Sequence, residues 1–158
     1  MSKVVKYPDE LLKMKCTPVE SFGEKLHTIL DEMYQIMKAE NGIGLAANQA
    51  GYAFRGFIMT DRKGKLWEFL NPKITEREGC TQINEGCLSA PGVFVQVPRA
   101  QTITVTAQDR NGEKFTVVCE DLEAVCVQHE TDHLDGIFFL EKTSRNQRRH
   151  ALKVLGLK

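Results

Sequence analysis

The hydrophobic positions between residues 121 and 136 follow a helical period. One stripe at spacings i, i+3, i+4, i+7 and i+11 contains Leu122, Val125, Cys126, His129 and His133. Residues three and four apart share one face of an α-helix, so the stripe predicts a helix whose inward face carries both histidines. Asp121 is the expected N-cap of this helix, and Gly136 is its expected C-terminal stop.

Two further segments show the same period. The first is expected to start at a capping box, Ser21–Glu24, and to end at Asn41-Gly42, with apolar residues at helical spacing between them. The second is expected to run from Ser144 to Gly156, with Gln147 completing another capping box.

Alternating apolar and polar residues predict strands between these helices. The expected strands are residues 55–60, 66–70, 102–109 and 115–118. Residues 62–65 form the turn between the first two, and Pro72 is expected to end the second, because proline cannot donate to a ladder. Asn111-Gly112 predicts a hairpin turn between the last two.

The predicted helix over 121–136 carries a His-Glu-x-x-His motif. Each helical residue advances by about 100°, so His129 and His133 nearly eclipse and can hold one divalent ion. Glu130 projects to the side, where it can reach a water on that ion. Two core histidines satisfied by hydrogen bonds are the alternative, but a shared ion satisfies both rings at once. A hydrolytic metal needs a third protein ligand, which the rest of the chain must supply.

Composition restricts the possible classes of function. The 158 residues fit a single domain, and a formal net charge of zero gives no general affinity for DNA or for an acidic lipid surface. The apolar runs are too short to span a bilayer, and residues 1–6 contain no apolar signal core. We therefore expect a soluble cytoplasmic protein with no membrane partner.

The five cysteines are an odd number without any Cys-x-x-Cys pair. This argues against a disulfide framework and against a four-cysteine zinc module. Cys87, within Glu85–Ser89, has the most informative neighbours, and Gly86 before it allows a second backbone to approach closely. Cys87 is therefore the favoured third ligand, although spacing alone leaves the other cysteines open.

A glycine-rich segment, Gly42–Gln49, superficially looks like a phosphate-binding loop. No Gly-Lys-Ser/Thr follows it, and it comes after a predicted helix rather than a strand. Its glycines instead allow tight or left-handed backbone, and its alanines allow close packing.

Three segments together resemble the three motifs of peptide deformylases, in the same order and at roughly the same separation. They are Gly-Ile-Gly-Leu-Ala-Ala-Asn-Gln (42–49), Glu-Gly-Cys-Leu-Ser (85–89) and Gln-His-Glu-Thr-Asp-His (128–133). The resemblance implies an α+β fold, with mixed antiparallel β-sheets around a central metal-binding helix, in a single catalytic domain of residues 1–158. It also implies a metal-dependent hydrolase that removes the N-formyl group from the N-terminal formylmethionine of newly made polypeptides and releases formate.

The resemblance further implies a role for each motif residue. Cys87, His129 and His133 would bind the metal, and Glu130 would be the general acid and base. Gln49 and the backbone N–H of Leu88 would face the developing oxyanion. The residues flanking the substrate backbone would be Ile43, Gly44 and Gly86. The pocket for its methionine side chain would be lined by Ile43, Val125, Cys126 and the His129 ring.

Two imidazoles and a thiolate suit zinc and would also hold ferrous iron, nickel or cobalt. The resemblance favours one ferrous ion per chain as the native metal and nascent formyl-Met peptides as the partner. Residues 142–158 contain six Lys or Arg and no acidic residue. A solvated helix face is the first interpretation of this charge, and contact with ribosomal RNA is a secondary hypothesis.

Three residues near the motifs need separate comment. Phe94 stands where many bacterial peptide deformylases carry an arginine that contacts the bound peptide. Glu85 is expected to pair with Arg99 and hold the ligand loop, the alternative being two separate surface charges. Asp132 either supports the site or is merely solvated.

Two other functions remain open at this level. A peptidase would use the same motif with a downstream third ligand, for which Glu141 is the candidate. A structural metal site would hold a binding domain together, but such sites usually have four protein ligands, and only three good ones are evident here.

Overall fold

The computed structural model describes residues 3–157. The elements follow one another as η1 Glu10–Lys13, α1 Glu24–Ala39, β1 Gly44–Ala46, η2 Ala47–Ala50, β2 Gly56–Thr60, β3 Leu66–Glu78, β4 Thr81–Gly86, β5 Phe94–Arg99, β6 Thr102–Gln108, β7 Lys114–Glu120, α2 Asp121–Leu134, η3 Phe139–Glu141 and α3 Arg145–Val154.

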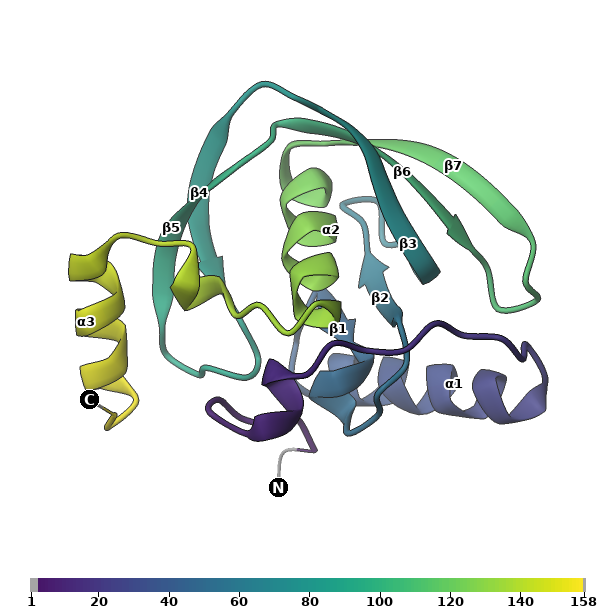
Figure 1. Cartoon of the computed structure of the whole chain (residues 1–158), viewed down its shortest axis with the longest axis horizontal. Helices are drawn as coiled ribbons and strands as arrows, with labels where there is room; N and C mark the ends of the chain where they lie inside the picture. Colours follow the sequence, from purple (N-terminus) through teal and green to yellow (C-terminus); the bar gives the residue numbers. More distant parts are fainter. Residues whose placement is uncertain (1–2, 158) are drawn as a thin grey trace.

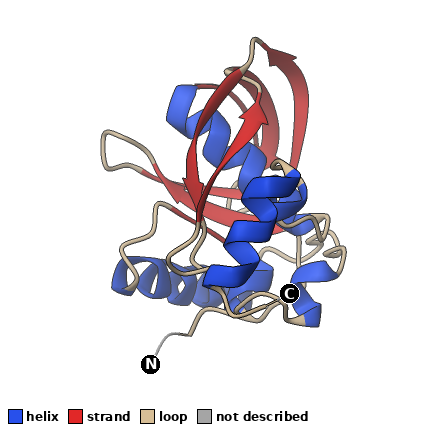
Figure 2. Cartoon of the chain, turned by 90° about the vertical axis from the view of Figure 1, so that its left-hand side faces the viewer, coloured by secondary structure: helices blue, strands red, loops and turns tan. Residues whose placement is uncertain are grey.

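Helix α2 occupies the centre of the molecule, between two antiparallel sheets (Figure 1). The larger sheet has the strand order β1-β2-β3-β6-β7, and the smaller sheet pairs β4 with β5. Helix α3 lies against the outer side of β5, as the view turned by 90° also shows (Figure 2), and α1 runs below β1 and β2. This arrangement confirms the predicted α+β class with its central helix.

The sequence of α2 suits its central position because the helix is buried on nearly every side. All seven residues from Ala124 to Glu130 are buried, and Ala124 and Val127 pack into a core with Phe57 and Phe69 of the larger sheet. A helix surrounded by packing needs small or apolar residues on most faces. The hydrophobic stripe that predicted this helix therefore covers only one part of its buried surface, namely the face that carries the two histidines.

Several predicted boundaries are wrong, each for a local reason. Asp121 is the first residue of α2, with φ of 53°, and Glu120 is the N-cap. Helix α1 begins after Gly23, which provides no side-chain cap, so the capping box predicted at Ser21 does not form. Pro72 does not end its strand: β3 continues to Glu78, and Pro72 lies at a register shift where the ladder is already interrupted.

The predicted C-terminal helix forms, with half of its capping box. The Ser144 side chain accepts a hydrogen bond from the Gln147 backbone N–H at 3.2 Å. The Gln147 side chain instead accepts a bond from the Gln96 backbone N–H of β5, at 2.8 Å. This contact attaches α3 to the smaller sheet.

Strands β4 and β5 themselves were not predicted, because Gly86 and Pro98 weaken their strand pattern. No helix within residues 3–157 is long and apolar enough to cross a membrane.

Candidate metal centre and substrate cavity

Three potential metal ligands come together between the smaller sheet and α2. Cys87 directly follows β4, while His129 and His133 lie one turn apart on α2. Their donor atoms all lie within 4.8 Å of one another, and Cys87 Sγ is 3.4 Å from His133 Nε2. Within residues 3–157 this is the only such group of three or more His, Cys, Asp or Glu side chains. The structure thus brings together the three residues that the sequence selected as ligands.

A chain of ion pairs fixes the orientation of His129. Its Nδ1 lies 2.9 Å from a Glu85 carboxylate oxygen, which directs Nε2 toward Cys87 and His133. Arg99 donates two hydrogen bonds to Glu85, at 2.9 and 3.0 Å, and a third to Asp132 at 2.6 Å. The predicted Glu85–Arg99 pair is confirmed, and Asp132 belongs to the same network rather than being merely solvated.

The electrostatic environment of the ligands suits a bound cation. Burial lowers the pKa of His129, but hydrogen bonds with Cys87 and Glu85 outweigh burial and raise this pKa well above its ordinary value. The site therefore attracts positive charge to the position that His129 Nε2 faces. Burial and the charge on His129 lower the pKa of His133 well below its ordinary value, which keeps that ring neutral, as a metal ligand must be. A thiolate and two imidazoles are also a suitable donor set for a divalent transition metal.

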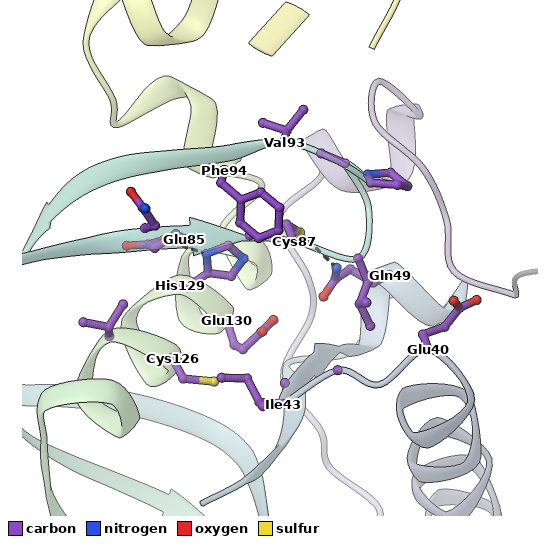
Figure 3. Close-up of a pocket in the computed structure, with 18 of the residues that line it drawn as sticks. Glu40, Ile43, Gln49, Glu85, Cys87, Val93, Phe94, Cys126, His129 and Glu130 are labelled. Carbon is purple, nitrogen blue, oxygen red and sulfur yellow. Dashed lines mark hydrogen bonds and ion pairs between the residues drawn. The ribbon is translucent and has the colours of Figure 1, made fainter. Parts of the chain in front are cut away.

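Glu130 is buried beside the ligands (Figure 3). Its carboxylate lies against Gly44 of β1. Burial raises the pKa of its carboxyl to about 7. One of its oxygens has no hydrogen-bond partner among the described residues, and it is therefore free to bind a water. A Cβ on Gly44 would come within 2.6 Å of the other oxygen and 2.8 Å of Cys126 Sγ, so the glycine provides the space that the carboxylate occupies.

The Gln49 side chain is held with its N–H groups toward the ligand cluster (Figure 3). Its carbonyl oxygen accepts a hydrogen bond from the Ala46 backbone N–H at 2.9 Å. Its amide nitrogen lies 3.3 Å from Cys87 Sγ and 3.1 Å from Ser89 Oγ. The amide orientation follows from these contacts, and it places a hydrogen-bond donor next to the predicted metal position.

A cavity of about 490 Å³ opens onto this cluster. Every residue predicted to contact substrate lines it, namely Ile43, Gly44, Gly86, Leu88, Val125, Cys126 and His129, and so do Gln49, Cys87 and Glu130. His133 is not part of this lining and is almost completely buried. Gly86 was predicted to allow the close approach of a second backbone, but the group that lies against it is a side chain. A Cβ on Gly86 would come within 2.7 Å of the Phe94 ring.

Two residues that support the site were missed in the sequence. Asn48 is fully buried, and its side chain donates to the His133 backbone carbonyl at 2.7 Å, linking η2 to the turn that carries a ligand. Ser89 accepts from Gln49 and donates to the Val5 carbonyl at 2.6 Å. Both lie inside motif segments, but neither residue type indicates by itself which partner it will bind.

The alternative third ligand does not lie at the site. The Glu141 carboxylate accepts a hydrogen bond from the Phe138 backbone N–H at 2.7 Å, which caps η3, and it is absent from the ligand group. Among the described residues, no fourth His, Cys, Asp or Glu belongs to that group. A three-ligand arrangement beside an open cavity is typical of catalytic rather than structural metal sites.

Comparison with known proteins decides the family. The family model for polypeptide deformylase matches residues 1–149. The chain belongs to this family. It is 43% identical over 162 residues to the peptide deformylase of Wolinella succinogenes, covering 98% of this chain and 95% of that one. It is 42% identical over 149 residues to peptide deformylase 1 of Shewanella oneidensis, with 93% and 89% coverage.

Solved structures agree with this assignment. A crystal structure of a peptide deformylase from Legionella pneumophila superposes with a TM-score of 0.94 at 38% identity, covering 99% of this chain and 94% of that one. The enzyme from Thermus thermophilus gives a TM-score of 0.91 at 37% identity, with 98% and 92% coverage. The family confirms the predicted activity, which is hydrolytic removal of the N-formyl group from newly made polypeptides.

Proposed function

We propose that this deformylase holds one divalent metal ion with Cys87, His129 and His133 and uses Glu130 as its general acid and base. The proposal is supported by the gathering of three donor atoms within 4.8 Å, two of them on the cavity-lining residues Cys87 and His129, with a buried carboxylate beside them. A bound ion supplies Lewis acidity that lowers the pKa of water toward about 7. We propose ferrous iron as the native ion, with zinc, nickel or cobalt able to occupy the same ligands.

Glu130 carries the proton through both halves of the reaction. Its pKa of about 7 makes it able to accept a proton from the attacking water and return it near neutral pH. The proton then passes to the departing nitrogen, which would otherwise leave as an unstable amide anion. The carboxylate has an oxygen without a hydrogen-bond partner among the described residues, which leaves that oxygen available to accept a proton from the water.

Negative charge develops on the formyl oxygen as the water attacks. Gln49 Nε2 and the backbone N–H of Leu88 donate hydrogen bonds to that oxygen. Gln49 is suited to this role because its own carbonyl is anchored to Ala46, which fixes the direction of the amide N–H groups. Loss of one such donor typically lowers the rate by about 10²–10³.

The substrate occupies the cavity with its methionine side chain toward α2. Ile43, Val125, Cys126 and the His129 ring line an apolar slot for the thioether, and Gly44 and Gly86 line the cavity along the path of the peptide backbone. Such a slot discriminates by about 1–3 kcal/mol per methylene, so it favours methionine over shorter side chains. Selectivity for formyl over acetyl then comes from crowding near the ligands, where an added methyl group must fit.

The enzyme acts on nascent formyl-Met peptides in the cytoplasm, with no DNA or membrane partner. The basic segment from Lys142 onward includes α3, and we assign it a secondary role as a contact for ribosomal RNA. Lys or Arg replaced by Gln on α3 should then weaken ribosome binding in a salt-dependent manner. Unchanged co-sedimentation with ribosomes would refute this assignment.

Formate release from formyl-Met-Ala tests the proposed chemistry. The protein is purified without oxygen and loaded with ferrous iron or nickel, and a Glu130→Gln variant is compared with it. We expect turnover in the parent and a loss of at least about 10²-fold in the variant, with unchanged metal content. Glu113→Gln, in the exposed β6–β7 hairpin, is the matched control and should retain full activity. Full activity of Glu130→Gln would refute its assigned role.

A further inference from the structure

A second cavity adjoins the substrate cavity at the outer face of the smaller sheet. It has a volume of about 390 Å³ and lies between α3 and the segment 92–95. The two cavities share Gly92, Val93 and Phe94, so the second adjoins the first at these residues. We call this second cavity the α3 groove. None of the substrate-binding or catalytic roles assigned above involves its far wall, which is formed by α3.

The exposed hydrophobic residues of the protein are concentrated along this path. The described residues include five large exposed hydrophobic side chains, namely Met14, Ile43, Phe94, Val118 and Val154. Ile43 lines the substrate cavity, Phe94 lines both cavities, and Val154 lines the α3 groove. Phe94 is 70% exposed, which leaves a large apolar ring in water at the junction between the two. Apolar surface adjoining an active site is typical of a surface that a ligand covers.

We propose that the α3 groove binds the residues of the substrate that follow the first two, with an apolar side chain seated between Phe94 and Val154. This proposal rests on the proposed function, because the occupant is the remainder of the peptide whose formyl end lies at the ligands. That peptide must leave the substrate cavity through its rim. An extended chain advances by about 3.3 Å per residue, so a groove that adjoins the rim at Gly92, Val93 and Phe94 is reached within a few residues.

The chemistry of the groove selects the kind of side chain. The described residues that line it include no carboxylate, lysine or arginine. Its polar members are Asn146, Gln147 and His150. The Gln147 carbonyl oxygen is already bound to the Gln96 N–H, which leaves the amide nitrogen to donate to a peptide carbonyl. The groove therefore favours an uncharged, apolar residue over an acidic one at the third or fourth position of the substrate.

Peptides of different length and side chain test this proposal. The values of kcat/KM are compared for formyl-Met-Ala, formyl-Met-Ala-Leu-Leu and formyl-Met-Ala-Asp-Asp, each of which ends in a C-terminal amide. We expect the Leu-Leu peptide to exceed the dipeptide by about tenfold, which is within the range measured for apolar contacts in enzyme pockets. The Asp-Asp peptide should gain nothing over the dipeptide.

Variants at the far wall connect this preference to the groove. Val154→Asp should abolish the advantage of the Leu-Leu peptide while leaving formyl-Met-Ala turnover unchanged. Val154→Lys should raise kcat/KM for the Asp-Asp peptide several-fold, which mere damage to the helix would not do. Val118→Asp, on β7, is the matched control because Val118 is similarly exposed and lines neither cavity. This control should behave like the parent with all three peptides.

Two sets of results would overturn the proposal. The first is equal kcat/KM for the dipeptide and the Leu-Leu peptide in the parent. The second is an unchanged Leu-Leu advantage in Val154→Asp, or an equal loss in Val154→Asp and Val118→Asp. By contrast, a metal-loaded parent that cleaves no formyl peptide would refute the proposed function itself, and this proposal with it.

Discussion

Removing one partner of the buried ion pair between Arg99 and Glu85 should strongly destabilise the fold, and Arg99→Met tests this. Both side chains are 4% exposed and are joined by two hydrogen bonds at 2.9 and 3.0 Å. Removing one partner of a buried pair leaves an uncompensated charge and typically costs about 3–5 kcal/mol. Arg99 also donates to Asp132 on α2, so its loss removes one of the links between the ligand helix and the smaller sheet.

The free energy of unfolding is measured by urea titration of the metal-free protein, followed by circular dichroism. We expect Arg99→Met to lose about 3–5 kcal/mol, equivalent to roughly two to four powers of ten in the folding equilibrium. The double variant Arg99→Met/Glu85→Gln should recover part of this loss, because it leaves no unpaired carboxylate buried. Metal affinity should fall by about 10–100-fold in Arg99→Met, because Glu85 no longer holds His129 firmly.

Arg62→Met is the matched control for this experiment. Arg62 pairs with Glu123 at 2.6 Å, but its side chain is 55% exposed. Solvent screens such a pair, so its loss should change the unfolding free energy far less than the loss of Arg99. The reasoning is refuted if Arg99→Met loses less than about 1 kcal/mol or no more than the control.

Three further outcomes are expected. Gly44→Ala should lower kcat by about 10²-fold or more with metal content unchanged, because the added methyl displaces the Glu130 carboxylate; normal formate release would contradict this. The contribution of Glu130 to the stability of the metal-free protein should fall as pH rises from 4.5 to about 7, because folded Glu130 keeps a proton that the unfolded chain releases in this range. Glu130→Gln should remove up to about 3 kcal/mol of that pH dependence in parallel urea titrations, and identical pH profiles would oppose the assignment. Asn48→Leu should weaken zinc binding in a competition with a chelator, because it removes the hydrogen bond to the His133 carbonyl; unchanged zinc affinity would show that Asn48 does not position this ligand.

The sequence predicted the parts of the site that depend on local spacing. His129 and His133 lie one helical turn apart wherever α2 forms, so their shared face could be derived without any structure. Cys87 could not be selected on spacing alone, because its distance from α2 depends on how β4 pairs with β5. That pairing was not predicted. The residues around Cys87 made it the favoured third ligand, and the three-motif resemblance then distinguished it from the other cysteines.

Tertiary contacts explain the remaining differences. Pro72 predicted a strand end, but the register shift in β3 absorbs it without ending the strand. The partner of Asn48 lies 85 residues away, so no local pattern could reveal it. The α3 groove likewise requires α3 to lie against β5, which the helical period of residues 145–154 does not determine.

The most direct test of the metal centre measures metal content and formate release on the same samples of parent and Cys87→Ala. The account predicts about one ion per chain and formyl-Met-Ala turnover in the parent, with both strongly reduced in Cys87→Ala. Cys126→Ala, which alters a cavity-lining thiol outside the ligand group, should keep its metal. Full metal content in Cys87→Ala would contradict the assigned ligand set and would revive a site built from the two histidines and a different third ligand.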